Sequence, residues 1–296
     1  MKLYLKKIGL IGTGMLGNAV GAHLIESGYN LIVYNRTTEK TKKLKDLGAI
    51  IVTSPKEVAK NSEMLFTVVK DANAVKQVSF EKDGIVYGKH ENLVVCDMST
   101  ISPLDSKIIA KKFSENGIPM LDTPVMGGPN VAVTGNLVLM VGGQKENFEK
   151  CKEVFNVVAS KVFHIGENGY AHAVKLAMNL QIAMLALALS EGIILARGSN
   201  IDPKIFLEIL NSTYFKTGMS ENKAYKMIQD NFEPTFTLEN LRKDINTIVD
   251  TSKSLGLELP MTNAAKETYE KAVKEGFGDF DYTGILAFIK KLNGQN

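Results

Sequence analysis

Two polar side chains interrupt an apolar stretch of the chain. The segment AVKLAMNLQIAMLALALSEG, residues 173–192, is almost entirely apolar but carries Lys175 and Asn179 in its first two turns. Residues four apart lie on one face of a helix, so both side chains point the same way. Two interpretations are open. Lys175 extends to the surface from the edge of the helix, or it acts as a general acid and base, a role that desolvation of a lysine favours.

A glycine motif near the start of the chain is the second candidate for chemistry. The segment GLIGTGMLG, residues 9–17, has G-x-G-x-x-G spacing, follows a strand-like run and opens a helical pattern. That context is typical of a dinucleotide-binding turn, in which the glycines allow the turn, the approach of a pyrophosphate and close helix–strand packing. The predicted cofactor-binding residues of this loop are Gly12, Thr13, Gly14, Met15, Leu16 and Gly17.

The end of the second predicted strand selects the dinucleotide. An NAD enzyme places Asp or Glu there to hold the ribose diol, whereas this chain has Asn35 followed by Arg36 and Thr37. Asn35 does not repel a 2′-phosphate, Arg36 can pair with one, and Thr37 offers a hydroxyl. The pattern favours NADP over NAD, although a surface arginine in a solvated turn would give the same residues.

The elements that position these residues change character along the chain. Short β-branched runs at residues 6–12, 30–35, 64–69 and 92–97, with further strands in 119–125 and 137–143, alternate with helical patterns. This alternation predicts a doubly wound, Rossmann-type α/β domain. Beyond Gly166 long helical patterns take over. We therefore predict a cofactor domain at residues 1–166 and an all-α domain at 167–296.

Composition excludes several classes of protein. The 296 residues carry a net charge of +3, from 35 basic and 32 acidic residues without a basic block, which argues against binding to nucleic acid or a lipid surface. Cys96 and Cys151 lack the spacing of metal ligands and no histidines are paired, so we expect no metal site. Glycines break the signal-like start, and polar residues interrupt the apolar segment 173–192. These features predict a cytoplasmic protein outside the membrane.

Four motifs in order carry a resemblance to a known family: GLIGTGMLG at 9–17, DTPVMGGP at 122–129, GYAHAVKLAMN at 169–179 and RKDI at 242–245. The chain resembles the 3-hydroxyisobutyrate dehydrogenase-related family of β-hydroxyacid dehydrogenases. The resemblance implies an all-α C-terminal domain like that of the 6-phosphogluconate dehydrogenase superfamily. It also implies a homodimer or homotetramer and a small carboxylate as substrate.

The resemblance assigns roles to individual residues. In the family the lysine of the K-x-x-x-N pattern is catalytic, which here means Lys175, with Asn179 orienting the substrate. Gly127 and Gly128 match the loop that binds the substrate carboxylate, and Met126 replaces the usual serine before them. Further implied contacts are Ser99 with the substrate and Val69, Lys70, Thr100 and Lys243 with the cofactor.

Structural roles are open for several of these residues. Paired glycines also form plain tight turns, Ser99 or Thr100 could cap the following helix, and Lys243 with Asp244 could be an exposed ion pair. Val69 and Lys70 stand where the family commonly has Leu-Pro.

The implied function is hydride transfer between NADP(H) and a small β-hydroxyacid or semialdehyde. The substrate classes are 3-hydroxyisobutyrate, tartronate or succinic semialdehyde, glyoxylate and serine. An imine reductase on the same scaffold and a non-catalytic NADP-binding adaptor are the alternatives. Lys175 and Asn179 together argue against both, because those relatives carry another residue at the lysine position or have lost it.

Overall fold

The computed structural model describes residues 7–295. The chain divides into two compact units, one ending at Leu176 and the other beginning at Ala177. The division falls within the long helix α8 (Tyr170–Gly198). The boundary at residue 166 between the cofactor domain and the all-α domain stays a prediction.

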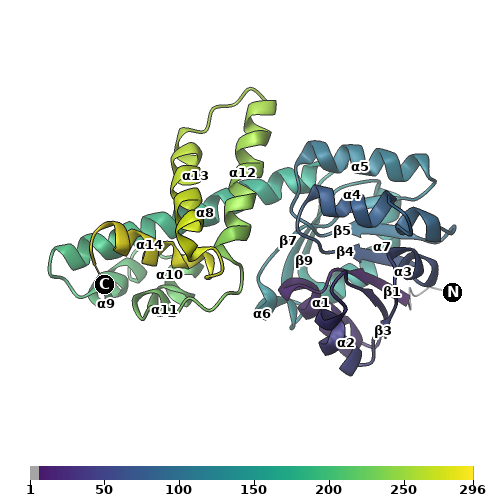
Figure 1. The fold of residues 1–296 in the computed structure, drawn as a ribbon, viewed down its shortest axis with the longest axis horizontal. Helices are drawn as coiled ribbons and strands as arrows, with labels where there is room; N and C mark the ends of the chain where they lie inside the picture. Colours follow the sequence, from purple (N-terminus) through teal and green to yellow (C-terminus); the bar gives the residue numbers. More distant parts are fainter. Residues whose placement is uncertain (1–6, 296) are drawn as a thin grey trace. The chain divides into compact units, whose positions relative to one another are not determined.

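A six-stranded parallel sheet forms the centre of the first unit, with strand order β3-β2-β1-β4-β5-β6 (Figure 1). This is the strand order of a Rossmann fold, in which ligands bind at the carboxyl ends of the strands. The fold class predicted from the sequence is therefore confirmed. The strands are β1 (Lys7–Ile11), β2 (Asn30–Tyr34), β3 (Ile50–Ile51), β4 (Met64–Thr67), β5 (Val94–Asp97) and β6 (Met120–Asp122).

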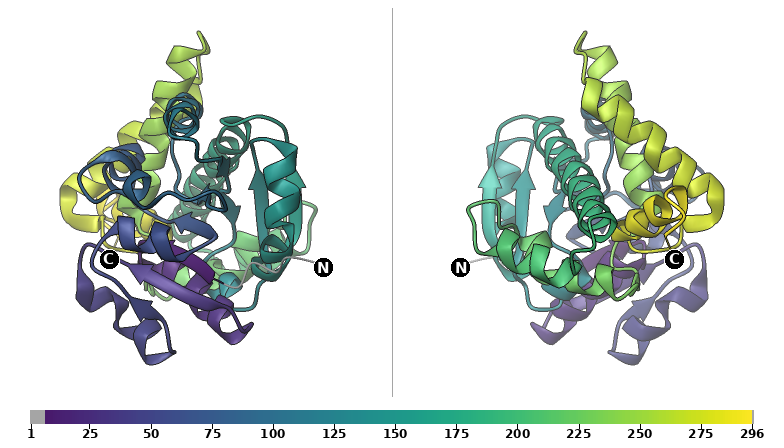
Figure 2. Two further views of the ribbon diagram at one scale, coloured as in Figure 1. Left: turned by 90° about the vertical axis from the view of Figure 1, so that its right-hand side faces the viewer. Right: turned by 90° about the vertical axis from the view of Figure 1, so that its left-hand side faces the viewer.

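Helices cover both faces of this sheet because neighbouring residues of each strand point to opposite sides. On β5, for example, Val94 and Cys96 belong to one core with α1 (Met15–Glu26) and α7 (Lys145–Val158). Val95 belongs to the opposite core. That second core is covered by α3 (Pro55–Asn61), α4 (Ala72–Phe80) and α5 (Pro103–Glu115). The left view of Figure 2 shows the twisted sheet between these helices. Short helical segments complete the unit: η1 (Thr38–Thr41), α2 (Lys42–Asp46), η2 (Ile85–Gly88) and α6 (Pro129–Ala132).

A smaller sheet follows the large one. It contains β7 (Val125–Met126), β8 (Leu137–Val141) and β9 (Ala159–His164). The predicted strand at 119–125 is thus two strands, β6 and β7, which belong to different sheets. Strands β3 and β9 were not predicted from the sequence. An antiparallel bridge between Asp122 and Gly142 connects the end of β6 to the end of β8.

The second unit is helical, as the long helical patterns in this part of the sequence predict. Its helices after α8 are α9 (Pro203–Asn211), α10 (Gly218–Asn222), α11 (Ala224–Ile228), α12 (Leu238–Ser254), α13 (Pro260–Ala272) and α14 (Ile285–Leu292), with short turns η3 (Val273–Phe277) and η4 (Tyr282–Gly284). Ala183 and Ala186 of α8 pack in a core with residues of α12, α13 and α14. Within that core, the buried hydroxyl of Tyr269 donates a hydrogen bond to the carbonyl of Ala183 (3.2 Å).

Helix α8 has the length and apolar composition of a membrane-spanning helix, with a mean hydropathy of 1.7 over 18 residues. A core helix passes the same test.

Candidate active site

The glycine loop connects β1 to α1 in the way that a dinucleotide-binding turn requires. Gly12 has a φ of +102°, and a Cβ there would collide with the carbonyl oxygen of Val68. A Cβ on Gly17 would collide with the carbonyl oxygen of Gly12. Gly14 faces open space, with no atom within 4 Å of a Cβ added there. Two glycines are thus required by packing, and the third leaves the backbone accessible to a ligand.

The N-terminus of α1 is suited to an anion. Gly14 is its N-cap and supplies no side-chain cap, and the first turn contains no acidic residue. The N–H groups of Met15 and Leu16 therefore belong to the set that a helix start leaves unsatisfied. Gly14 and Met15 are exposed. The loop fits a pyrophosphate in conformation, charge and access.

Asn35 fixes this loop from the end of β2. Its Oδ1 accepts a hydrogen bond from the N–H of Thr13 (3.0 Å), and its Nδ2 donates to the carbonyl of Thr37 (2.8 Å). The neutral amide thus has protein partners at both ends. Arg36, the next residue along the chain, is exposed.

The loops after β4 and β5 are joined by a buried serine. Ser99 is 3% exposed, and its hydroxyl accepts a hydrogen bond from the N–H of Val69 (3.0 Å). Lys70 is exposed and Thr100 is partly buried. The structure therefore brings Val69 and Ser99 together and uses the Ser99 hydroxyl to hold the neighbouring loop.

Lys175 lies at the predicted substrate loop. Its Nζ is 3.3 Å from the Sδ of Met126, the last residue of β7, directly before the turn to α6. Gly127 follows with a φ of +117°, and a Cβ there would press on Leu137 at 2.8 Å. Gly128 is exposed and faces open space. The predicted catalytic lysine and the predicted carboxylate-binding glycines therefore occupy one place in the first unit.

Asn179 belongs to a buried polar cluster on α8 and α12. Its Nδ2 donates to Oδ2 of Asp244 (2.6 Å), and both residues are 1% exposed. The Nζ of Lys243 lies 2.7 Å from the other carboxylate oxygen of Asp244, with 16% of the Lys243 side chain exposed. The pair Lys243–Asp244 exists, but it is buried and connected to Asn179. The alternative of an exposed ion pair is wrong, because Asp244 lies on the face of α12 that also buries Leu241 and Ile245.

Three further ionisable side chains are buried near the ends of β5 and β6, and none of them was predicted as a site residue from the sequence. Asp97 ends β5, Asp122 ends β6 and His172 is in the first turn of α8, and all three are 0% exposed. The three residues are far apart in the sequence, so no local sequence pattern indicates that they lie close together.

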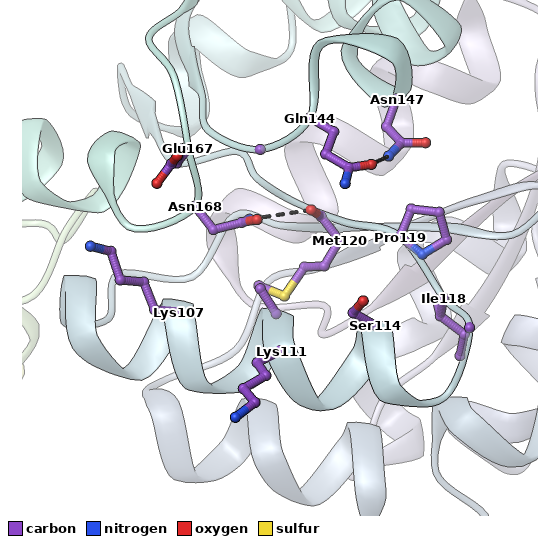
Figure 3. Close-up of a pocket in the computed structure, with 13 residues that line it drawn as sticks. Lys107, Lys111, Ser114, Ile118, Pro119, Met120, Gln144, Asn147, Glu167 and Asn168 are labelled. Carbon is purple, nitrogen blue, oxygen red and sulfur yellow. Dashed lines mark hydrogen bonds between the residues drawn. The ribbon is translucent and has the colours of Figure 1, made fainter.

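A separate hollow of about 590 Å³ lies beside α5 and the start of α7. Figure 3 shows Lys107, Lys111 and Ser114 on α5, with Gln144 and Asn147 on the other side. None of the predicted site residues lines it. It is distinct from the place where Lys175 meets Met126.

Comparison with known proteins agrees with this geometry. The profile of the NAD binding domain of 6-phosphogluconate dehydrogenase matches residues 7–166. A second profile, described as NAD-binding of NADP-dependent 3-hydroxyisobutyrate dehydrogenase, matches residues 169–289. The chain belongs to the 3-hydroxyisobutyrate dehydrogenase-related family of β-hydroxyacid dehydrogenases.

Relatives within this family differ in substrate. The probable 3-hydroxyisobutyrate dehydrogenase-like protein 1 of Arabidopsis thaliana is 33% identical over 293 residues, covering 97% of this chain and 86% of that protein. The 2-hydroxy-3-oxopropionate reductase of Escherichia coli is 29% identical and covers 97% of this chain and 98% of its own. The crystal structure of a 3-hydroxyisobutyrate dehydrogenase from Salmonella typhimurium superposes with a TM-score of 0.87 at 26% identity, covering 95% and 99% of the two chains. Membership in the family makes the chain an oxidoreductase of the hydroxyacid dehydrogenase type that uses a nicotinamide cofactor.

Proposed function

We propose that this protein transfers a hydride between NADP(H) and a small β-hydroxyacid or semialdehyde, with Lys175 as the general acid and base. The contact between the Lys175 ammonium and Met126, next to the Gly127–Gly128 turn, is the observation that carries the proposal. It puts a proton donor beside exposed backbone amides. The amides are suited to a carboxylate, and the ammonium to the oxygen on a neighbouring carbon.

The residues that would hold the cofactor are those of the glycine loop and of the turn after β2. Gly14 and the first N–H groups of α1 would receive the pyrophosphate, and Arg36 with Thr37 would receive a 2′-phosphate. The bound nicotinamide supplies or accepts the hydride. Val69 and Ser99, joined by their hydrogen bond, would line the nicotinamide end together with Lys70, Thr100 and Lys243.

Lys175 would move the proton. In the direction of reduction its ammonium donates a proton to the oxygen of the carbonyl as that oxygen gains charge. In the direction of oxidation the neutral amine accepts the proton of the substrate hydroxyl. The thioether of Met126, which Nζ contacts, is a weak hydrogen-bond acceptor.

Asn179 would orient the substrate. Its Nδ2 is committed to Asp244, which fixes the plane of the amide. Its Oδ1 is buried and has no hydrogen-bond partner among residues 7–295. Buried polar atoms are rarely unpaired, and a substrate hydroxyl would complete this one.

A panel of substrates tests the function. Small hydroxyacids with NADP⁺ and small semialdehydes with NADPH are assayed by the absorbance of the reduced cofactor, in parallel with cyclic imines. Turnover of one hydroxyacid–semialdehyde pair in both directions is expected. Turnover of imines alone would favour the imine reductase, and cofactor binding without turnover of any compound would favour the adaptor.

A further inference from the structure

A buried histidine lies between two buried carboxylates at the strand ends. The Nε2 of His172 is 3.7 Å from Oδ2 of Asp97 and 3.9 Å from Oδ1 of Asp122. Neither ring nitrogen of His172 has a hydrogen-bond partner among the described residues, and Oδ2 of Asp97 has none either. Since an unpaired buried polar group is costly, the arrangement needs an explanation beyond packing.

The two carboxylates are neighbours by the register of the sheet. Asp97 and Asp122 are directly paired positions on the parallel strands β5 and β6. Burial raises the pKa of Asp97, while the nearby His172 and hydrogen bonds from Thr67 and Ser99 act in the opposite direction. A buried charge is tolerated only with a counter-charge or hydrogen bonds. The Nε2 of His172 lies within 4 Å of both carboxylates and forms an ion pair with them only when the ring is protonated.

Asp122 also holds the chain where it leads into α8. Its Oδ2 accepts a short hydrogen bond from the N–H of Gly169, and its Oδ1 accepts from Nδ2 of Asn168 (3.0 Å). The hydroxyl of Ser106, on α5, also donates a hydrogen bond to Oδ1 of Asp122. The start of α8 is therefore fixed to the end of β6 by the residues before the helix and by His172 within it.

Asp97 holds the loops of the predicted nicotinamide end. Its Oδ1 accepts from the hydroxyl of Thr67 (2.6 Å) and from the N–H of Ser99 (3.2 Å). Ser99 in turn accepts from the N–H of Val69. One group of buried ionisable side chains thus contacts both these loops and the first turn of α8.

His172 is also close to Lys175 along the helix. The two residues are three apart, so they lie on the same side of α8 and are separated by a rise of about 4.5 Å. A rotation or shift of the first turn would move the ammonium of Lys175 relative to Met126 and Gly127.

We propose, on the basis of the proposed catalytic role of Lys175, that His172 is a positioning residue. Held between Asp97 and Asp122, it fixes the first turns of α8 on the ends of β5 and β6 and thereby sets where the Lys175 ammonium meets the substrate. His172 itself does not touch the substrate.

A double-mutant cycle tests the proposal with the full-length protein. The variants are His172→Ala, His172→Gln, Lys175→Ala and the two double variants. His164→Gln is the control, because His164 is a partly buried histidine of β9 whose Nε2 donates one hydrogen bond to the carbonyl of Gly143. We expect His172→Ala to lower kcat by about ten- to a hundredfold, the scale of a small misplacement, with little change in the affinity for NADPH. In the Lys175→Ala background the same change should cost almost nothing more.

Hydrogen exchange supplies a readout that does not depend on activity. Amides of residues 170–176 should exchange faster in both His172 variants than in the parent or in His164→Gln. His172→Gln keeps a polar side chain of similar size but not the imidazole ring, so it covers the case in which the alanine variant does not fold. Parent-like kcat and exchange in folded His172→Gln would overturn the proposal, as would equal fold losses from His172→Ala in both backgrounds. Lys175→Ala alone decides the proposed function: near-parent turnover there would refute the catalytic role of Lys175, and the positioning role with it.

Discussion

The Nζ of Lys175 lies 3.3 Å from the Sδ of Met126. Lys175 of α8, which stands out in the sequence for its charge, thus contacts Met126, the residue that stands where the resemblance leads us to expect a serine. The contact connects the proposed proton donor to a residue of the proposed substrate loop. The kinetic effects of substitutions at Lys175 and at Met126 can therefore be compared with each other.

Replacing Lys175 with alanine should lower kcat by about 10²- to 10⁴-fold, the usual contribution of general acid–base catalysis. The affinity for NADPH, measured by fluorescence titration, should change little. Lys175→Arg should restore little activity, because arginine stays protonated and its planar fork places the donor differently. Lys161→Ala, at an exposed lysine of β9, is the control. Normal turnover of Lys175→Ala would identify the lysine as a packing residue.

Met126→Ser should lower KM for carboxylate substrates with little effect on kcat. A hydroxyl at this position adds one donor beside Gly127 and Gly128, and a hydrogen bond contributes about 0.5–1.5 kcal/mol, or roughly two- to tenfold in KM. Steady-state kinetics on the best substrate measures the effect. Met261→Ser, at a methionine that is 71% exposed, should leave KM unchanged. A higher KM in Met126→Ser would mean that the thioether itself contacts the substrate.

Arg36→Ala should weaken NADPH binding by about ten- to a hundredfold and leave NADH binding unchanged. The reason is the loss of one charge-assisted hydrogen bond, which contributes about 1.5–3 kcal/mol. Lys40→Ala, at an exposed cation in the same turn region, controls for a general loss of positive charge. Equal Michaelis constants for NADPH and NADH in the parent would contradict the preference for NADP.

Asp244→Ala should destabilise the protein strongly. It removes the partner of both Asn179 and Lys243 inside the helical unit, and breaking a buried ion pair costs about 3–5 kcal/mol. Asp244→Asn should cost less, because an amide oxygen can still accept from Asn179. Urea unfolding of both variants gives the free energies. Asp46→Asn, at the exposed pair with Lys42, should have almost no effect.

Acid should weaken the helical unit through Asp281. Burial would raise the pKa of this carboxyl, but hydrogen bonds and charge from Lys223, with further bonds from Thr235 and Thr283, bring it below its usual value. A lowered pKa in the folded state means that the stabilisation is complete above the unfolded pKa, near 4, and is lost as the pH falls through the folded pKa. Thermal unfolding between pH 6 and 2 should show a smaller decrease in Tm for Asp281→Asn than for the parent. An identical decrease would exclude this carboxyl as a source of acid sensitivity.

The fold could be predicted where the local pattern was sufficient. Buried strands such as β4 and β5 are continuous apolar runs, and the glycine loop has both its spacing and its context. Strand β3 has only two residues, and β9 is half exposed with the sequence ASKVFH, so neither produces a continuous apolar run. Site residues could be predicted only where the residue type or the spacing of a motif is itself unusual. The roles of Asp244 and His172 depend on contacts with residues distant in sequence. Neither composition nor periodicity reveals those contacts.

The two hydrogen bonds of Asn35 have a consequence for how this protein could change over time. An aspartate at this position, one nucleotide away in the genetic code, could still accept from the N–H of Thr13. It would, however, set a carboxylate oxygen against the carbonyl of Thr37, where the amide now donates. An Asn35→Asp substitution would therefore distort the turn unless residues 36–38 changed as well. Under the proposed preference for NADP, coenzyme choice and the geometry of this loop would therefore change together.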